Sequence, residues 1–226
     1  MIKVENIAPW GFEHAIRGMR NPLNSWNKSD SKWVIEDEEY PNLSAADFKI
    51  GPNDLDLMRR LYKAGTEHRK YLRQIFVSFD ITAPLYWWKE FDTYKVGTVS
   101  NSCSTMHKIA SKEFNIDDFS HEQLSEDIIR VTYDDQDYLN SALDCFYDVI
   151  AMLNTYRERY LKTKDKKDWW QLIQLLPSSY NQKRTITMNY ENVFNIIHQR
   201  ENHKLDEWRD FVKILLDLPY VKEIME

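Results

Sequence analysis

The chain has few of the residues that interrupt regular structure. Among its 226 residues only 5 are glycine and 7 are proline. Glycine and proline end helices and strands, so their scarcity predicts long uninterrupted elements and no flexible linker. No internal repeat and no low-complexity segment divides the chain. We therefore expect a single domain spanning residues 1–226.

Cysteine is also scarce, and long apolar runs are missing. The two cysteines, Cys103 and Cys145, provide neither a disulfide framework nor a zinc motif. No apolar run of 18 residues exists, and the N-terminus lacks the apolar core of a signal peptide. These absences predict a soluble, cytoplasmic protein with no membrane partner. We expect Cys145 to be a small buried apolar residue of a helix.

An excess of positive charge is lacking as well. The net charge is −6, which argues against a nucleic-acid partner because phosphate binding needs a basic face. The acidic run at 36–39 places consecutive carboxylates in different directions, so we interpret it as solvated surface and predict no metal site. Hydrophobic residues make up 42% of the chain and aromatic residues 14%, enough for a sizeable core.

Hydrophobic periodicity predicts several elements. Residues 75–82 alternate apolar and polar, which indicates a strand that ends at Pro84 and leads into a helix over 85–94. The pattern of 53–62 predicts an amphipathic helix. Residues 113–170 favour helix, with one long core helix over 137–160.

The most informative stretch lies near the C-terminus. Residues 185–188 alternate like a short strand, and Asn189 then stands at a helix N-cap position. The helix that follows carries Val193, Ile196, Ile197 and Arg200 at helical spacing, with Asn192, Asn195 and Gln199 on its polar side. Amides and an arginine beside a strand can bind a planar polar ligand and its phosphate. The alternative is a surface helix with a solvated polar face.

Two further segments contain candidate ligand-binding groups. Arg17 and Arg20 flank Gly18, and small hydroxyl residues follow, so this segment is either an anion-binding turn or a polar loop. Residues 94–107 combine Lys95 and Gly97 with a run of small hydroxyl residues. They can bind phosphate or carbonyl groups, or they can simply form a polar loop that caps a helix.

The C-terminal part of this pattern resembles the flavin-dependent thymidylate synthases. Leu176-Pro177, Thr185, Thr187, Asn189, Asn195 and Arg200 match the order of that family without a gap, over about the last quarter of the chain. A second match is a histidine followed by a strand that ends in Ala-Pro, here His68 and Ala83-Pro84.

The family's signature, Arg-His-Arg followed by a Ser-x-Asn-Glu-x-Ser-x-Arg pattern, is where the chain departs. No Arg-His-Arg is present. In one register Asn101 matches the motif's Asn, Ser104 its second serine, and Ser102 replaces its Glu. In the other register Cys103 takes the position of that serine and Lys95 the last position of Arg-His-Arg. Arg17, Arg20, Lys95, Lys183 and Arg184 are candidates to replace the missing charge.

The resemblance implies an α+β fold with a small, mainly antiparallel sheet flanked by long helices, the fold of the thymidylate synthase-complementing proteins. It implies a homotetramer that stacks FAD on dUMP and methylates dUMP to dTMP with NADPH and methylenetetrahydrofolate. By the same resemblance His68 and Ser104 are the catalytic candidates. Cofactor-binding candidates are Lys95, Asn101, Asn189 and Asn195, and substrate-binding candidates are Arg200, Cys103 and Ser102. The alternative is a relative of the same fold that binds nucleotide or flavin without catalysis, or with another specificity.

Overall fold

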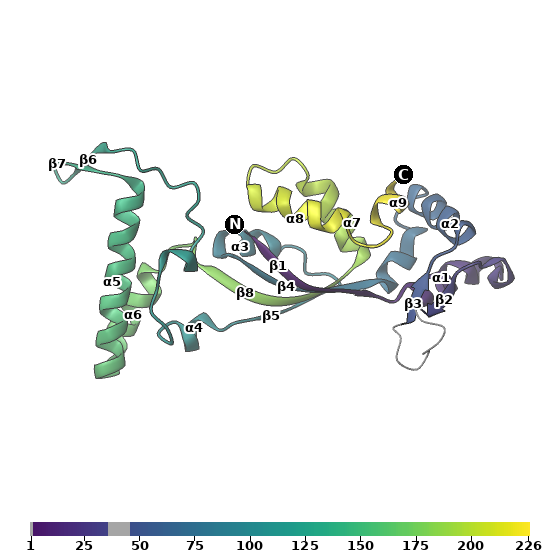
Figure 1. Cartoon of the computed structure of the whole chain (residues 1–226), viewed down its shortest axis with the longest axis horizontal. Helices are drawn as coiled ribbons and strands as arrows, with labels where there is room; N and C mark the ends of the chain where they lie inside the picture. The colour runs from purple at the N-terminus through teal and green to yellow at the C-terminus, as the bar shows by residue number, and fades with distance from the viewer. Residues whose placement is uncertain (1, 36–45) are drawn as a thin grey trace. The chain divides into compact units, whose positions relative to one another are not determined.

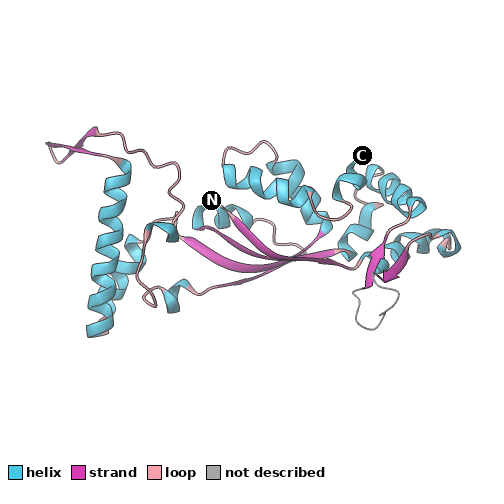
Figure 2. Cartoon of the chain, viewed as in Figure 1, coloured by secondary structure: helices cyan, strands magenta, loops and turns pink. Residues whose placement is uncertain are grey.

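The computed structural model describes residues 2–35 and 46–226, so the acidic run at 36–39 lies outside the described residues. Figure 1 shows the elements along the chain, and Figure 2 separates helices from strands. The strands are β1 (Lys3–Trp10), β2 (Lys32–Ile35), β3 (Ala46–Lys49), β4 (Phe76–Pro84), β5 (Thr98–Ser102), β6 (Ile129–Tyr133), β7 (Gln136–Asn140) and β8 (Asn181–Asn189). The α-helices are α1 (Phe12–Arg20), α2 (Pro52–Lys63), α3 (Leu85–Phe91), α4 (Thr105–Lys108), α5 (Ala142–Thr163), α6 (Lys166–Leu175), α7 (Tyr190–Arg200), α8 (Asp206–Leu216) and α9 (Val221–Met225). Short 3-10 helices are η1 (Asn21–Leu23), η2 (Trp26–Lys28), η3 (Arg69–Gln74) and η4 (Ile116–Asp118).

The strands form one larger sheet and two small ones. The larger sheet has the order β1-β4-β8-β5, and its strands lie side by side in Figure 1. The pairs β2–β3 and β6–β7 are antiparallel two-stranded sheets. A small sheet accompanied by helices was expected from the resemblance, and this α+β fold class is confirmed.

The chain forms two compact units. Unit 1 contains 1–3, 81–93 and 101–184, and unit 2 contains 4–80, 94–100 and 185–226. Strands β4 and β8 each contribute residues to both units. The single domain expected from composition stays a prediction.

The core of unit 2 follows the two predicted periodicities. Val77 and Phe79 of β4 are fully buried, as the alternation of 75–82 requires. Val193 and Ile197 of α7 are buried at helical spacing. Phe211 of α8 packs edge-on against Phe79, with ring centroids 5.9 Å apart. The predicted strand and helix are therefore both confirmed.

The core of unit 1 lies beneath the helix pair α5 and α6. Ile150 and Leu153 of α5 face Leu172 of α6, and Phe119 packs edge-on against Phe146 at 5.2 Å. These few side chains bury only one face of α5, so its remaining faces stay exposed.

The long helix begins later than predicted. Residues 137–140 belong to β7, and α5 starts at Ala142. Asp134 and Asp135 both have positive φ and turn the chain into a hairpin, an option that helical periodicity does not reveal. Ser141 then caps α5 by accepting a hydrogen bond from the Asp144 backbone N–H at 3.0 Å. The prediction that Cys145 is buried is also wrong, because Cys145 lies on an exposed side of α5.

The boundaries of other elements also differ from the predicted ones. β8 begins at Asn181, four residues before the predicted start, and α3 ends at Phe91, three residues early. Part of the 94–107 segment, for which a polar loop was one of two alternatives, forms strand β5 at the end of the larger sheet. Its residues 99–102 are exposed, and an exposed polar strand carries no alternation that would identify it from sequence.

Candidate functional site

The junction of β8 and α7 is built as the sequence predicts. Asn189 ends the strand, and its side-chain oxygen accepts a hydrogen bond from the Asn192 backbone N–H at 3.0 Å. The Tyr190 N–H donates to the Ile75 carbonyl oxygen at 2.9 Å, which ties the start of α7 to the segment before β4. The asparagine thus caps the helix and fixes the direction in which α7 leaves the sheet.

Residues 94–98 are attached directly to this junction. Asn192 Nδ2 donates to the Val96 carbonyl oxygen at 2.5 Å and to Thr98 Oγ1 at 2.9 Å. Gly97 has φ +72°, and a Cβ at this position would lie 2.3 Å from Asn189 Nδ2. A side chain is therefore excluded at Gly97 by both the backbone conformation and the close approach of Asn189. The predicted polar face of α7 is covered here by protein.

Arg200 is the last residue of α7, and its side chain contacts two aromatic residues, Tyr94 and Trp208. Its Nε donates to the Tyr94 hydroxyl at 2.9 Å, and its guanidinium lies over the Trp208 ring, 4.6 Å from the centroid. The Tyr94 hydroxyl in turn donates to Gln199 Oε1 at 2.9 Å. These contacts fix the plane of the guanidinium, which a lysine at this position cannot reproduce.

Two arginines, Arg69 and Arg73, lie beside Glu191 at the start of α7. Arg73 forms two hydrogen bonds to the Glu191 carboxylate, at 2.5 and 3.1 Å, and Arg69 Nε lies 3.8 Å from the same carboxylate. Asn195 follows Glu191 by four residues and therefore emerges on the same side of the helix. It is half-buried, and in the part of the chain that the structure describes its side chain forms no hydrogen bond.

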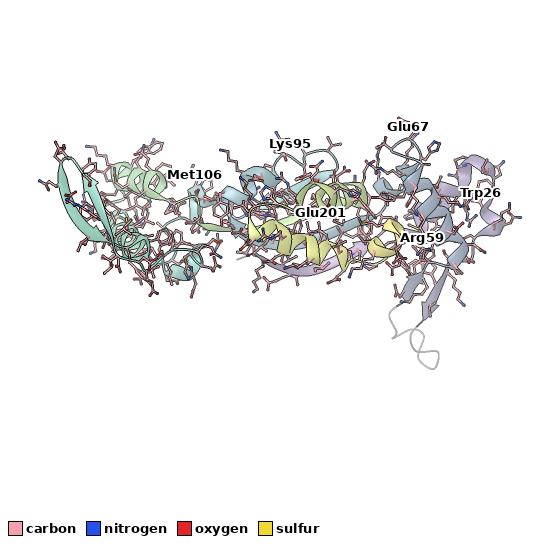
Figure 3. The ribbon with its side chains drawn as sticks, turned by 90° about the horizontal axis from the view of Figure 1, so that it is seen from above. Trp26, Arg59, Glu67, Lys95, Met106 and Glu201 are labelled. Carbon is pink, nitrogen blue, oxygen red and sulfur yellow. The ribbon has the colours of Figure 1, made fainter. Side chains whose placement is uncertain are left out.

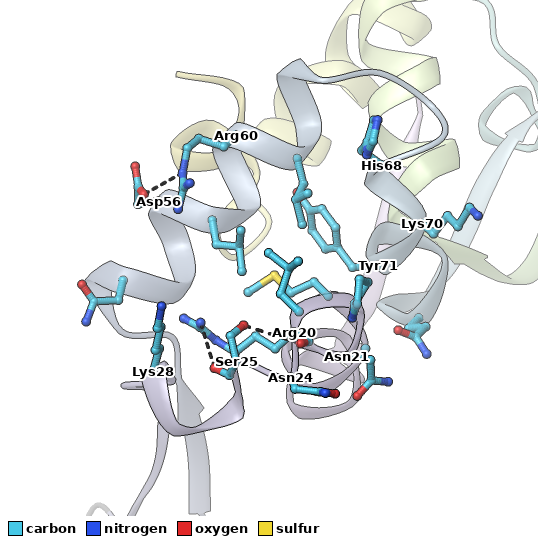
Figure 4. A pocket seen from close by; sticks show the side chains of 18 of the residues that line it. Arg20, Asn21, Asn24, Ser25, Lys28, Asp56, Arg60, His68, Lys70 and Tyr71 are labelled. Carbon is cyan, nitrogen blue, oxygen red and sulfur yellow. Dashed lines mark hydrogen bonds and ion pairs between the residues drawn. The ribbon is translucent and has the colours of Figure 1, made fainter.

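A cavity of about 1190 Å³ opens elsewhere in unit 2. Its walls come from the end of α1 and the segment after it, from α2, and from η3 (Figure 4). Met19, Leu57, Leu61 and Tyr71 contribute apolar surface. Asn21, Asn24, Asn27, Asn53 and Gln74 contribute amide groups. Such a mixture of apolar surface and a few polar groups is typical of sites for small organic ligands.

The charged groups of the cavity differ in availability. Arg20 is buried and donates from Nε to Asp54 Oδ1 at 2.5 Å, so its charge is already paired. Arg60 is paired with Asp56 at 2.9 Å at the surface. Lys28 and Lys70 form no ion pair among residues 2–35 and 46–226. In Figure 4 the side chains of Lys28 and Arg60 extend toward one another, whereas Lys70 extends away from them.

The carboxylate of Asp54, which binds Arg20, accepts hydrogen bonds from several other groups. Asp54 also accepts hydrogen bonds from the hydroxyls of Ser29 and Ser31, each at 2.6 Å. Burial by itself raises the pKa of Asp54, but the two hydroxyls and Arg20 lower it more, so the net pKa lies below its usual value. The hydroxyl residues that we considered for an anion-binding turn are therefore used to bind Asp54.

His68 lies at the rim of the cavity, immediately before η3. Its side chain is exposed, and among the described residues its ring forms no hydrogen bond. The neighbouring Tyr71 is buried and donates its hydroxyl to the Met58 carbonyl oxygen at 2.8 Å. Burial raises the pKa of Tyr71 well above its usual value, so this phenol stays protonated. None of Lys95, Asn189, Asn195 and Arg200 lines this cavity.

The remaining predicted residues lie in unit 1 or on the surface. Asn101, Ser102 and Cys103 are exposed at the end of β5 and just after it. Ser104 caps the short α4 by accepting a hydrogen bond from the His107 N–H at 3.2 Å. Lys95 lies on the surface in the 94–98 segment of unit 2 (Figure 3).

Arg184 and Arg17, two further candidates to replace the arginines of the absent Arg-His-Arg, differ in whether their charge is paired. Arg184 donates from Nη1 to Asp92 at 2.7 Å and lies over the Trp88 ring at 4.2 Å, so its charge has local partners. Arg17 is exposed on α1 and forms no ion pair in the part of the chain that the structure describes.

Some important residues carried no signal in the sequence. Tyr94 positions Arg200, yet in sequence it is an isolated tyrosine after an aromatic helix. Lys28 is one lysine in a polar segment, and only the packing of α2 against that segment brings it to a cavity. The sequence places Asn192 on the polar side of its helix, but its hydrogen bonds to residues 96 and 98 follow only from the tertiary structure.

The described residues contain neither a metal-binding cluster nor a membrane-spanning helix. No cluster of three or more histidine, cysteine, aspartate or glutamate side chains within 2–35 and 46–226 is arranged to hold a metal ion. None of the helices in those same ranges has the length and apolar character needed to cross a bilayer.

Comparison with known proteins identifies the fold. No protein-family model matches the sequence, and no curated protein matches it. Among solved structures, thymidylate synthase X from Helicobacter pylori with FAD and dUMP superposes with a TM-score of 0.62 at 18% identity. That match covers 99% of this chain and 94% of the other. A second structure of flavin-dependent thymidylate synthase ThyX from Helicobacter pylori, complexed with FAD and dUMP, gives a TM-score of 0.63 at 17% identity, over 99% and 96% of the two chains. The chain thus has the fold of these enzymes along its whole length.

Proposed function

We propose that the protein is a flavin- and nucleotide-binding protein of the ThyX fold, and that its activity is FAD-dependent methylation of dUMP to dTMP. Methylenetetrahydrofolate and NADPH are the co-substrates in this proposal, and the active form is a homotetramer. The observation that carries it is the match of fold over 99% of the chain to enzymes solved with FAD and dUMP. The Thr-x-Thr-x-Asn, Asn195 and Arg200 pattern adds residue-level support.

The cavity beside His68 fits a flavin dinucleotide in size and chemistry. Ligand pockets typically enclose roughly 300–1,000 Å³, so about 1190 Å³ leaves room for a large cofactor. The apolar wall at Leu57 and Leu61 suits an aromatic ring system. Lys28 suits a phosphate of the pyrophosphate, and Arg60 can join it because its pair with Asp56 is exposed and weak. FAD, when bound, supplies the hydride chemistry, and the protein contributes binding and orientation.

Arg200 and Asn195 are the residues that we assign to the nucleotide. The guanidinium of Arg200 is already oriented by Tyr94 and Trp208, so little conformational entropy is lost when it meets a phosphate or a uracil carbonyl. The Asn195 amide can form hydrogen bonds with a base edge. Asn189 contributes mainly by holding the 94–98 segment in place.

A second function is favoured by one specific observation. The chain has no Arg-His-Arg, and Arg20 and Arg184, two candidates to replace it, are paired with Asp54 and Asp92. A protein that binds a nucleotide or flavin without performing the methylation is consistent with this loss. Ser104, the other catalytic candidate, caps a helix, which leaves His68 as the more accessible group.

An absorbance spectrum of the purified protein is the first test. We expect the bands of oxidised flavin in the protein as purified or after addition of FAD, with a shift of these bands when dUMP is added. Growth of a thymidine-requiring cell that expresses the protein then distinguishes methylation from binding alone. A protein that takes up neither FAD nor dUMP contradicts both functions.

A further inference from the structure

The turn that follows α1 presents two asparagine side chains to the cavity. η1 begins at Asn21, and the Asn24 backbone N–H donates to the Asn21 carbonyl oxygen at 3.1 Å. Side chains three residues apart lie over one another in a 3-10 turn, so these two amides emerge on the same side. Both line the cavity, and in Figure 4 they lie apart from Lys28. The cavity therefore has an amide side and a cationic side.

The turn is closed by two hydrogen bonds between the residues that flank it. The Ser25 N–H donates to the Arg20 carbonyl oxygen at 3.2 Å, and Arg20 Nη1 donates to the Ser25 carbonyl oxygen at 3.2 Å. Arg20 is itself buried and paired with Asp54. Asn24 has φ +47°, a left-handed conformation that asparagine tolerates better than most residues. The two amides thus stand on a turn whose conformation the protein itself fixes.

Trp26 determines which groups of Asn21 a ligand can reach. The indole Nε1 donates to Asn21 Oδ1 at 2.8 Å. An indole N–H only donates, so the amide oxygen faces Trp26 and the Nδ2 group faces away from it. Asn21 Nδ2 and both ends of the Asn24 amide form no hydrogen bond within the described ranges 2–35 and 46–226. The pair therefore offers a ligand one donor from Asn21, and a donor beside an acceptor from Asn24.

An apolar side chain lies between the two amides in the sequence. Leu23 lines the cavity, yet it is 84% exposed. Pro22 also lines the cavity and stiffens the turn, because its ring fixes φ. An exposed leucine beside two amides suits a planar heterocycle, whose face covers the apolar group while its edge meets the polar ones. The turn has the features of a site for a ring.

The donors and acceptors of the turn match one kind of ring edge. A cyclic imide has a carbonyl oxygen, an N–H and a second carbonyl oxygen in a row, so it accepts, donates and accepts. Asn21 supplies the donor to one carbonyl, and Asn24 supplies the acceptor for the N–H and the donor to the other carbonyl. Adenine presents one acceptor beside its amino group and would leave one of these donors unused.

We propose that Asn21 and Asn24 bind the imide edge of the flavin ring, and that Trp26 is a positioning residue that orients Asn21. The inference rests on the proposed function, which places FAD in this cavity. It adds which side of the cavity takes the ring and which residues select it. The uracil of dUMP carries the same edge, so the test includes both ligands.

The first test titrates the whole protein with FAD and with 3-methyl-FAD, in which a methyl group replaces the N–H of the imide. Wild type is expected to bind 3-methyl-FAD at least about tenfold more weakly, because the Asn24 oxygen loses its donor and meets a methyl group. Asn24→Gly retains the positive φ without strain. It is expected to bind FAD more weakly and to reduce the discrimination to within about twofold. A purely structural role of Asn24 would weaken both ligands equally and leave their ratio unchanged.

The second test separates Asn21 from Trp26. Asn21→Ala removes a donor to a carbonyl that both ligands retain, so it is expected to weaken both roughly three- to tenfold and to keep the discrimination. Trp26→Phe keeps an aromatic ring but releases the Asn21 amide, and a smaller loss in the same direction is expected. Asn53→Ala, at an amide of the same cavity that belongs to α2, is the matched control and should leave both constants within about twofold. Circular dichroism verifies that the variants remain folded.

The outcomes separate this inference from the proposed function. A wild type that binds FAD and 3-methyl-FAD equally, or an Asn24→Gly variant with full discrimination, overturns the inference and leaves FAD binding intact. A wild type that binds no flavin overturns both. Discrimination between dUMP and 3-methyl-dUMP that Asn24→Gly abolishes, without discrimination between the two flavins, overturns the assignment to flavin and assigns these amides to uracil.

Discussion

Arg20 and Asp54 form a buried ion pair that links α1 to α2, with Arg20 Nε 2.5 Å from Asp54 Oδ1. The side chain of Arg20 is 5% exposed and that of Asp54 is 0% exposed. Because the hydroxyls of Ser29 and Ser31 bind the same carboxylate, the segment after α1 is held against the start of α2. The wall of the cavity therefore depends on a buried ion pair whose two charges already neutralise one another.

Asp54→Asn is expected to destabilise the protein. The variant leaves the Arg20 guanidinium buried without its counter-charge, which costs about 3–5 kcal/mol in the free energy of unfolding. Denaturant unfolding at neutral pH measures this loss. Asp56→Asn is the control, because the exposed Asp56–Arg60 pair contributes only about 0–1 kcal/mol. Equal small losses in the two variants would show that the buried pair is dispensable.

The same carboxylate predicts a pH dependence. The pKa of Asp54 is lower in the folded protein than in the unfolded chain, where aspartate titrates at about 3.9. Its contribution to stability is therefore present above the unfolded pKa and is lost as pH falls through the folded pKa. The difference in free energy of unfolding between wild type and Asp54→Asn should shrink over that acid range. A difference that stays constant down to the acid limit contradicts the lowered pKa.

Lys28→Ala is expected to weaken FAD binding. A charge-assisted contact to phosphate contributes about 1.5–3 kcal/mol, so the dissociation constant should rise roughly ten- to a hundredfold. Lys70→Ala is the matched control, since Lys70 lines the same cavity but extends away from Lys28 and Arg60. Flavin fluorescence titration reports both constants. Equal effects of the two substitutions would remove Lys28 from the phosphate site.

Arg200→Lys is expected to lower nucleotide affinity at least about tenfold, equivalent to 1.4 kcal/mol. Lysine lacks the planar group that lies over Trp208 and donates to Tyr94, so the free energy of unfolding should also fall by about 1 kcal/mol. Calorimetric titration of dUMP measures the affinity. Arg209→Lys, at an exposed arginine paired with Asp206 on α8, is the control and should bind dUMP like wild type.

Tyr94→Phe separates the position of Arg200 from its charge. The ring stays, but the hydroxyl that accepts from Arg200 and donates to Gln199 is lost. We expect an affinity for dUMP between those of wild type and Arg200→Lys. Unchanged affinity would mean that the stack on Trp208 alone orients the guanidinium.

Gly97→Ala tests the attachment of the 94–98 segment to α7. Alanine at positive φ costs roughly 1–2 kcal/mol, and its Cβ also collides with the Asn189 amide. In an Asn189→Ser background the helix cap is kept and the collision is removed. The cost of Gly97→Ala should therefore be smaller in that background, with a coupling of about 0.5–3 kcal/mol. Additive effects would show that Asn189 does not restrain the segment.

Local chemistry was readable from the sequence by itself. The alternation of 75–82 determined a buried strand, because side chains of a strand point alternately to its two sides. Asn189 at the boundary of two periodicities determined the cap of α7, since a side-chain oxygen there meets an unpaired backbone N–H. The spacing of Asn189, Asn195 and Arg200 pointed to the fold that the solved structures show.

Only the tertiary structure decided which polar groups remain available. Arg20 and Lys28 are both cations of one polar segment, yet Arg20 is bound by Asp54 from a distant helix and Lys28 is not. Likewise Asn192 and Asn195 both lie on the polar side of the sequence pattern of α7. Asn192 donates hydrogen bonds to residues 96 and 98, whereas the Asn195 side chain forms none among the described residues. These partners come from residues that are distant in the sequence. Contacts of this kind produce no periodic pattern in the chain, so the sequence alone does not predict them. The β6–β7 hairpin was missed because its turn depends on the positive φ of Asp134 and Asp135, which helical periodicity does not reveal.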